Sequence, residues 1–191
     1  FQKDILNLVY LCRHFGLPEV ADYWESVVAL NTWQQHRIAR LVVEKLFGTV
    51  TGKRLAILGF AFKADTNDTR EAPAIRICRD LLEEGAQLAI HDPKVAVQQM
   101  ARDLQQDAAP QADALSGTGT WVEAASVEDA VTGADAVLVL TEWKHYRDLN
   151  WEALAGRMRK PAWVFDARAV ADPEQVRAAG LTLWRVGDGE G

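Results

Sequence analysis

Residues 53–82 constrain the fold more than any other part of the chain, because three element types follow one another there. Residues 55–58 (LAIL) form a short apolar run, typical of a parallel strand that is covered on both faces. A polar loop follows, and then a helix with Pro73 in its first turn. The apolar residues of this helix recur at helical spacing: Ala74, Ile77, Cys78, Leu81 and Leu82. Gly85 is suited to end the helix, so the segment predicts one strand–loop–helix unit of an open parallel sheet.

The remainder of the chain up to its C-terminus continues this alternation of strands and helices. Short apolar runs predict further strands near residues 87–91, 120–122, 136–140, 163–165 and 181–186. Helices are expected near residues 94–104, 127–131, 151–158 and 173–179, with a surface loop over 105–119. Residues 49–191 are therefore predicted to form one α/β domain, a Rossmann-like parallel sheet of about six strands. Asp92, at the end of the second strand, is expected to cap the next helix; an acid at this place could instead hold a ribose.

Residues 1–48 are predicted to form a separate helical segment. Residues 18–47 contain no internal Gly or Pro after Pro18, and as one helix they would span about 45 Å. This helix carries a broad apolar surface, which includes Trp24, Val27, Val28, Leu41 and Val42. We expect it to join domains and to form a homodimer contact, although docking onto its own domain is an alternative.

Composition restricts the classes of partner. The formal net charge is −6 and there is no long basic run, which argues against nucleic acid or an anionic membrane as the main partner. No apolar run approaches the ~20 residues of a membrane span, and no signal peptide is visible. Cys12 and Cys78 both fall on apolar helical faces, which favours two buried, reduced cysteines in a cytoplasmic protein. The chain begins with Phe1 rather than Met, which suggests a fragment.

Charged side chains gather after two strands of the predicted sheet. Lys63 follows the first strand within a polar loop that also holds Asp68 and Arg70, and Arg168 follows the fifth strand. The carboxyl ends of parallel strands share one edge, so Lys63 and Arg168 could face one crevice, where two cations suit a pyrophosphate. For Lys63 alone, an exposed loop lysine is the alternative. A full G-x-G-x-x-G fingerprint is missing and no metal-binding or nucleophile-elbow motif occurs, so no metal is expected.

Four short motifs carry a family resemblance, and they occur in order: FQKDILNLVYL (1–11), GFAFKADTNDTREAPAI (59–75), TEW (141–143) and FDAR (165–168). Together they resemble the UDP-glucose/GDP-mannose dehydrogenase family, and its UDP-glucose branch in particular. Two positions depart from the family pattern. Ala167-Arg168-Ala169 stands where the family reads closer to Gly-Arg-Asn, and Ala64 stands where many relatives carry Lys or Pro.

The resemblance implies a parent enzyme that oxidises UDP-glucose to UDP-glucuronate with two NAD, through a cysteine directly before Phe1. It implies that Phe62 and Lys63 contact the UDP-sugar, that Arg168 holds its sugar or phosphate end, and that Asp4 orients water or a proton-transfer partner. Contacts to NAD would come from Phe1, Gln2, Lys3 and Arg70. Without the resemblance, Lys3 and Asp4 would be solvated charges of a first helical turn.

Alternatives remain within and outside this enzyme class. The sugar nucleotide could be GDP-mannose or a UDP-amino sugar. The chain could also be a nucleotide-sugar-binding module without catalysis. Since it has neither a dinucleotide fingerprint nor the nucleophilic cysteine, the chain alone is expected not to reduce NAD.

Overall fold

Six parallel strands form one sheet in the order β3-β2-β1-β4-β5-β6. The computed structural model describes residues 2–109 and 119–189; Phe1 and most of the loop predicted over 105–119 lie outside these ranges. The strands are β1 (Arg54–Leu58), β2 (Gln87–His91), β3 (Thr120–Glu123), β4 (Ala136–Val139), β5 (Trp163–Asp166) and β6 (Thr182–Arg185). The chain adds β2 and β3 on one side of β1 and then returns to add β4, β5 and β6 on the other side. This is the doubly wound Rossmann arrangement. The predicted α/β fold with about six parallel strands is confirmed.

Helices cover both faces of this sheet, as its right-handed crossovers require. They are α3 (Pro73–Glu83), α4 (Val97–Leu104), α5 (Val127–Val131), α6 (Trp151–Ala155) and α7 (Pro173–Ala178), with a short 3-10 turn η1 (Lys144–Tyr146). The residues of α3 that are buried are Ala74, Ile77, Cys78, Leu81 and Leu82, the face that the spacing predicts. Ser126 caps α5 by accepting a hydrogen bond from the Asp129 N–H.

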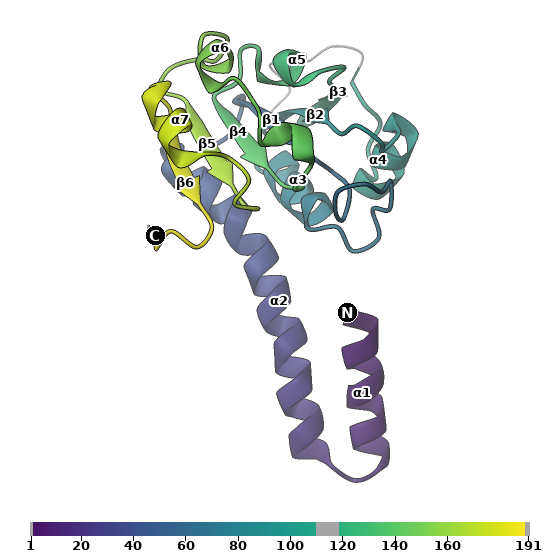
Figure 1. Ribbon diagram of the computed structural model, residues 1–191. Helices are drawn as coiled ribbons and strands as arrows, with labels where there is room; N and C mark the ends of the chain where they lie inside the picture. Colours follow the sequence, from purple (N-terminus) through teal and green to yellow (C-terminus); the bar gives the residue numbers. More distant parts are fainter. Residues whose placement is uncertain (1, 110–118, 190–191) are drawn as a thin grey trace.

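An N-terminal helical hairpin projects away from the sheet (Figure 1). It consists of α1 (Gln2–His14) and α2 (Pro18–Lys45), and α2 is continuous, about 42 Å long at 1.5 Å per residue. The far part of the hairpin has a small core of its own, separate from the domain core, made of Ile5, Val9, Cys12 and Ala21 with Trp24, Val27 and Val28 packed against it. The C-terminal part of α2 packs on α3 instead and joins the domain core.

The apolar surface expected on α2 is distributed differently from the prediction. Leu41 and Val42 are buried in the domain core, because this end of α2 lies against the sheet's helical layer. The large apolar side chains left exposed lie mostly on the hairpin: Leu6, Leu8, Tyr10, Leu11, Phe15, Leu17, Val20, Tyr23, Leu30 and Trp33. Among the helices of the described ranges, none has the length and hydropathy to cross a bilayer.

Strand register aligns four residues across the carboxyl edge of the sheet. His91 pairs with Leu58, Leu58 with Val139, and Val139 with Asp166. The segments after these residues therefore leave the sheet side by side. They include the predicted ligand loop after β1, Asp92 after β2, the TEW motif after β4 and Arg168 after β5.

Candidate functional site

Two side chains from neighbouring strands fix the backbone at the base of the loop after β1. The Asp92 Oδ2 atom accepts hydrogen bonds from the Phe60 and Ala61 N–H groups at 2.7 and 3.0 Å. The buried Thr141 hydroxyl donates to the Ala61 carbonyl at 2.7 Å. Phe60 and Ala61 are almost fully buried, so the loop starts from a rigid base.

Asp92 does not cap α4, contrary to the expectation. The cap position is Ala96, which makes no side-chain bond. The Asp92 Oδ1 atom instead accepts from the Lys94 and Val95 N–H groups, and the Trp143 indole N–H lies 3.2 Å from Oδ2. With its bonds to Phe60 and Ala61, this carboxylate thus joins the segments that follow β1, β2 and β4.

Phe62 and Lys63 follow directly from this base and are both exposed. The Phe62 N–H donates to the Asp68 carbonyl at 2.8 Å, which closes residues 62–68 into a compact loop. Among the described residues, no hydrogen bond or ion pair is found for the Lys63 ammonium group, although its charge helps to lower the pKa of Asp68. Lys63 is therefore available to an anion at this edge.

Arg70 is held at the end of the same loop by Asp68. Its Nε and Nη2 atoms donate to the two Asp68 carboxylate oxygens at 2.9 and 2.7 Å. This bidentate bond, followed by the bond from the Arg70 backbone N–H, lowers the pKa of Asp68 to about 2. The Arg70 side chain is 88% exposed, so its remaining donors face solvent, where the resemblance expects a cofactor.

Arg168, from the segment after β5, pairs with Glu142 from the segment after β4. The Arg168 Nε and Nη2 atoms both donate to the Glu142 Oε2 atom, the Nε at 2.8 Å. Partial burial raises the pKa of Glu142, but hydrogen bonds from its own N–H, Arg168 and the Ala64 N–H together bring it below its ordinary value. The strand order places Glu142 between the two segments that carry the predicted substrate-binding cations, and its carboxylate binds the cation of one of them, Arg168.

The backbone around Arg168 is set by the fully buried Asp166. Its Oδ1 atom accepts from the Arg168 N–H at 3.0 Å, and its Oδ2 atom accepts from the Val170 and Ala171 N–H groups at 2.7 Å. Ala169 has a φ of 54°, a left-handed conformation in which Asn or Gly is favoured over Ala. The departure from the family's Asn at this position therefore leaves the tight turn in place.

A polar aromatic cluster lies beside this edge, after β2 and β4. The His91 Nδ1 atom lies 2.9 Å from the Tyr146 hydroxyl, which is 3.0 Å from the His91 carbonyl. Burial, followed by the charge of His145, lowers the pKa of His91. Burial likewise lowers the pKa of His145 and raises that of Tyr146. These groups are therefore kept neutral near pH 7.

The N-terminal residues predicted to contact NAD, and Asp4, predicted to orient water or a proton-transfer partner, lie on a different element. Gln2, Lys3 and Asp4 form the first turn of α1, and Figure 1 shows this end of the hairpin pointing back toward the domain. Phe1 lies outside the described residues. The structure thus brings Phe62, Lys63, Arg70 and Arg168 to the segments of one sheet edge, and leaves Gln2, Lys3 and Asp4 on the hairpin.

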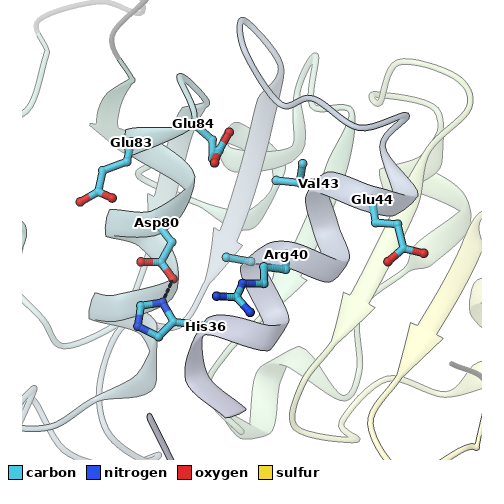
Figure 2. A pocket seen from close by; sticks show the side chains of 8 residues that line it. His36, Arg40, Val43, Glu44, Asp80, Glu83 and Glu84 are labelled. Carbon is cyan, nitrogen blue, oxygen red and sulfur yellow. Dashed lines mark hydrogen bonds and ion pairs between the residues drawn. The ribbon is translucent and has the colours of Figure 1, made fainter. Parts of the chain in front are cut away.

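A groove of about 390 Å³ lies between α2 and α3 (Figure 2). The His36 Nδ1 atom is 2.6 Å from the Asp80 Oδ2 atom there. The residues that line the groove include Arg40 and His36 and four acidic residues: Glu44, Asp80, Glu83 and Glu84. Because α3 runs from the carboxyl edge to the amino edge of the sheet, these acids lie at the opposite end from Lys63. An excess of carboxylates disfavours a diphosphate, so this groove does not suit such a ligand.

The switch point of this domain does not fit a dinucleotide in the usual way. Gly59 is followed by two buried residues rather than by further glycines. Asp92, which occupies the place of a ribose-binding acid, is already engaged by five protein N–H groups. In the described ranges, no cluster of three or more His, Cys, Asp or Glu side chains could hold a metal ion. Both cysteines are free and buried, and burial raises the pKa of the Cys78 thiol.

Residues 56–173 match the model of the UDP-glucose/GDP-mannose dehydrogenase family, UDP binding domain. This range begins in β1 and includes every sheet-edge segment described above. The chain belongs to this family. The sequence-based recognition of the family is thus confirmed.

Individual relatives agree with this assignment. UDP-glucose 6-dehydrogenase 2 from rice (Oryza sativa subsp. japonica) is 44% identical over 194 residues, with 98% of this chain and 40% of the relative covered. UDP-glucose 6-dehydrogenase from Drosophila melanogaster is 42% identical over 187 residues, with 98% and 39% covered. The structure is similar to that of a UDP-glucose dehydrogenase from the hyperthermophilic archaeon Pyrobaculum islandicum, with a TM-score of 0.68, 25% identity, and 95% and 36% of the two chains covered. The chain therefore spans about two-fifths of the length of the curated relatives it matches.

Proposed function

We propose that the carboxyl edge of the sheet binds a UDP-sugar between the loop after β1 and Arg168. The observation that carries this proposal is the exposed pair Phe62–Lys63 on a base fixed by Asp92 and Thr141. Lys63 supplies a cation for the diphosphate, and Phe62, 46% exposed, supplies an apolar surface for the uracil or sugar ring. Arg168 adds donors from the segment after β5.

We propose further that the chain is part of an NAD-dependent UDP-glucose 6-dehydrogenase. Such an enzyme converts the sugar C6 alcohol to a carboxylate by two oxidations. Each oxidation would need one bound NAD as the hydride acceptor. The high identity to enzymes of this name supports UDP-glucose over GDP-mannose or a UDP-amino sugar. In this proposal Gln2, Lys3 and Arg70 contact NAD and Asp4 orients water or a proton-transfer partner. The main NAD site lies outside these residues, because the switch point does not fit a dinucleotide.

We also propose a homodimer that forms through the hairpin, in the cytoplasm. The many large apolar side chains exposed on α1 and α2 support this arrangement, because they would leave water on forming an interface. A twofold contact is the commonest arrangement for identical chains.

Calorimetric titration tests the nucleotide site directly. UDP and UDP-glucose should bind more tightly than GDP, GDP-mannose or free NAD. Lys63→Ala should weaken UDP binding by about 1.5–3 kcal/mol, the scale of a charged hydrogen bond. Lys160→Ala is the matched control, since Lys160 is exposed before β5 at the amino edge. Equal UDP binding by Lys63→Ala and Lys160→Ala would remove Lys63 from the site.

Catalysis is tested separately from binding. The isolated chain should bind UDP without reducing NAD in the presence of UDP-glucose. Dehydrogenase activity by the complete protein would separate the enzyme from a module that only binds nucleotide sugars; failure of the complete protein to oxidise UDP-glucose would favour the module.

A further inference from the structure

Glu142 occupies a central position in the candidate site, although neither its type nor its spacing predicts a contact to ligand. It lies between the loop after β1 and the segment after β5, because β4 is the strand between β1 and β5. Its carboxylate accepts two N–H groups of the Arg168 guanidinium. One side chain therefore holds the guanidinium of Arg168 at a place between the loop after β1 and the segment after β5.

The bond to Glu142 occupies only part of the Arg168 guanidinium. Arginine has five N–H donors, and the two bonds to Glu142 use only Nε and one donor of Nη2. Within the part of the chain that the structure describes, no bond to Nη1 is found, so this side is left for another acceptor, and about a third of the Arg168 side chain is exposed. Glu142 thus holds one edge of the guanidinium and leaves the other edge open to an oxyanion.

Arg168 is restrained from its backbone as well. Asp166 is fully buried and accepts the Arg168 N–H, which fixes the start of the side chain. With Glu142 at the far end, little rotamer freedom remains to be lost when an anion binds, which lowers the cost of binding. An arginine without this support would have to be ordered by the ligand itself.

We propose that Glu142 is a positioning residue that aligns Arg168 with the Lys63 loop so that both cations contact the same diphosphate. This inference rests on the proposed nucleotide site. The opposite role is that Glu142 acts as an internal anion that competes with the ligand for Arg168. The two roles predict opposite effects of removing the carboxylate charge.

The test measures binding of UDP and of inorganic pyrophosphate to the whole chain for wild type, Glu142→Gln, Arg168→Ala and the double variant. We expect Glu142→Gln to weaken both ligands about tenfold, in line with loss of a charged hydrogen bond. Arg168→Ala should weaken binding at least as much. The double variant should bind no more weakly than Arg168→Ala, because Glu142 acts through Arg168.

A spectroscopic measurement separates positioning from general stability. The Arg168 Nε–H resonance should be sharp and protected from solvent exchange in the ligand-free wild type, and unprotected in Glu142→Gln. The free energy of unfolding should change little, since the pair is partly exposed. The matched control is Asp135→Asn, which removes a carboxylate charge from the Arg159 pair at 2.9 Å, before β4 at the amino edge. This control should leave ligand affinity and the Arg168 resonance unchanged.

The outcomes are distinct. Unchanged or tighter binding by Glu142→Gln would overturn the positioning role, as would additive losses in the double variant. If wild type binds pyrophosphate through Arg168 but shows no preference for UDP, the proposed nucleotide specificity fails while the positioning role stands. If wild type binds neither ligand, both proposals are overturned.

Discussion

Gly59 and Thr141 approach each other so closely that no other side chain could replace the glycine without movement. A Cβ atom built on Gly59 would lie 2.4 Å from the Thr141 Cβ and 2.6 Å from its Oγ1. Gly59 also has a φ of 95°. The contact lies where β1 and β4 end, so the glycine lets the two strands deliver their loops to one point. Here the role of the glycine is steric, rather than the phosphate-binding role of a dinucleotide fingerprint.

Gly59→Ala should lower the free energy of unfolding by about 2–4 kcal/mol, because a steric clash adds to an unfavourable φ. The matched control is Gly180→Ala, which has a φ of 72° but no atom within 4 Å of the added Cβ. This control should cost only about 1 kcal/mol. Urea unfolding followed by tryptophan fluorescence measures both. Equal losses would show that strain in φ, and not the contact with Thr141, requires glycine.

Asp92→Asn should destabilise the fold by about 1.5–3 kcal/mol, because an amide N–H₂ group would replace an oxygen that accepts backbone N–H groups. Asp172→Asn provides the comparison. Asp172 accepts the Glu174 and Gln175 N–H groups as the N-cap of α7, and Asn serves equally well as an N-cap. Thermal or urea unfolding of the two variants should therefore differ clearly. A neutral Asp92→Asn would mean that the loop after β1 does not depend on this carboxylate.

His91 should make the protein less stable as the pH falls. Its pKa in the folded chain is lowered, first by burial and then by His145, with Asp92 and Glu128 acting in the opposite direction. The unfolded chain therefore takes up the proton first, and stability is lost as the pH falls below the ordinary value of about 6.5. Above that value both states are neutral at this position, and no dependence arises from it.

His91→Gln should consequently flatten the decrease in the free energy of unfolding between about pH 7 and pH 5. His14→Gln is the control, because His14 lies exposed at the end of α1. Urea titrations at several pH values measure the slope. The same slope in wild type and His91→Gln would assign the acid sensitivity to other groups.

The proposed dimer should dissociate when charges are placed on the exposed apolar side chains of the hairpin. Sedimentation should give a mass near twice 21.2 kDa for wild type, since burying roughly 800 Å² per chain suffices for a stable dimer. Leu30→Glu and Tyr23→Glu should lower this mass toward that of the monomer. Phe47→Glu should not, because Phe47 is equally apolar and exposed but lies beyond the domain end of α2. A monomeric wild type at tens of micromolar would refute the dimer for these residues.

The sequence predicts local structure well where a segment determines it alone. The buried face of α3 and the strands follow from the spacing of the apolar residues. Contacts between distant segments could not be predicted in this way. Asp92 resembles a helix cap in the sequence, yet its Oδ2 partners belong to the segments after β1 and β4.

The same limit applies to the candidate site. The sequence predicts that Lys63 and Arg168 leave the same edge, because parallel strands share their carboxyl ends. It does not show that Glu142 lies between their segments and holds Arg168, although the TEW motif after a buried strand marks the place. The burial of Leu41 and Val42 was also missed, because helical spacing alone cannot distinguish the part of α2 that docks on the domain from the part that projects beyond it.

The continuous helix α2 gives the hairpin the mechanics of a lever. Its C-terminal end is anchored in the domain core, while the hairpin's own small core keeps the projecting end rigid. About 18 residues of α2 extend beyond the anchored part, or roughly 27 Å at 1.5 Å per residue. A tilt of about 10° at the anchor, next to the pair of His36 and Asp80, would therefore displace the far tip by about 5 Å. Small rearrangements at the α2–α3 contact are thus amplified into displacements large enough to alter any surface that rests on the hairpin.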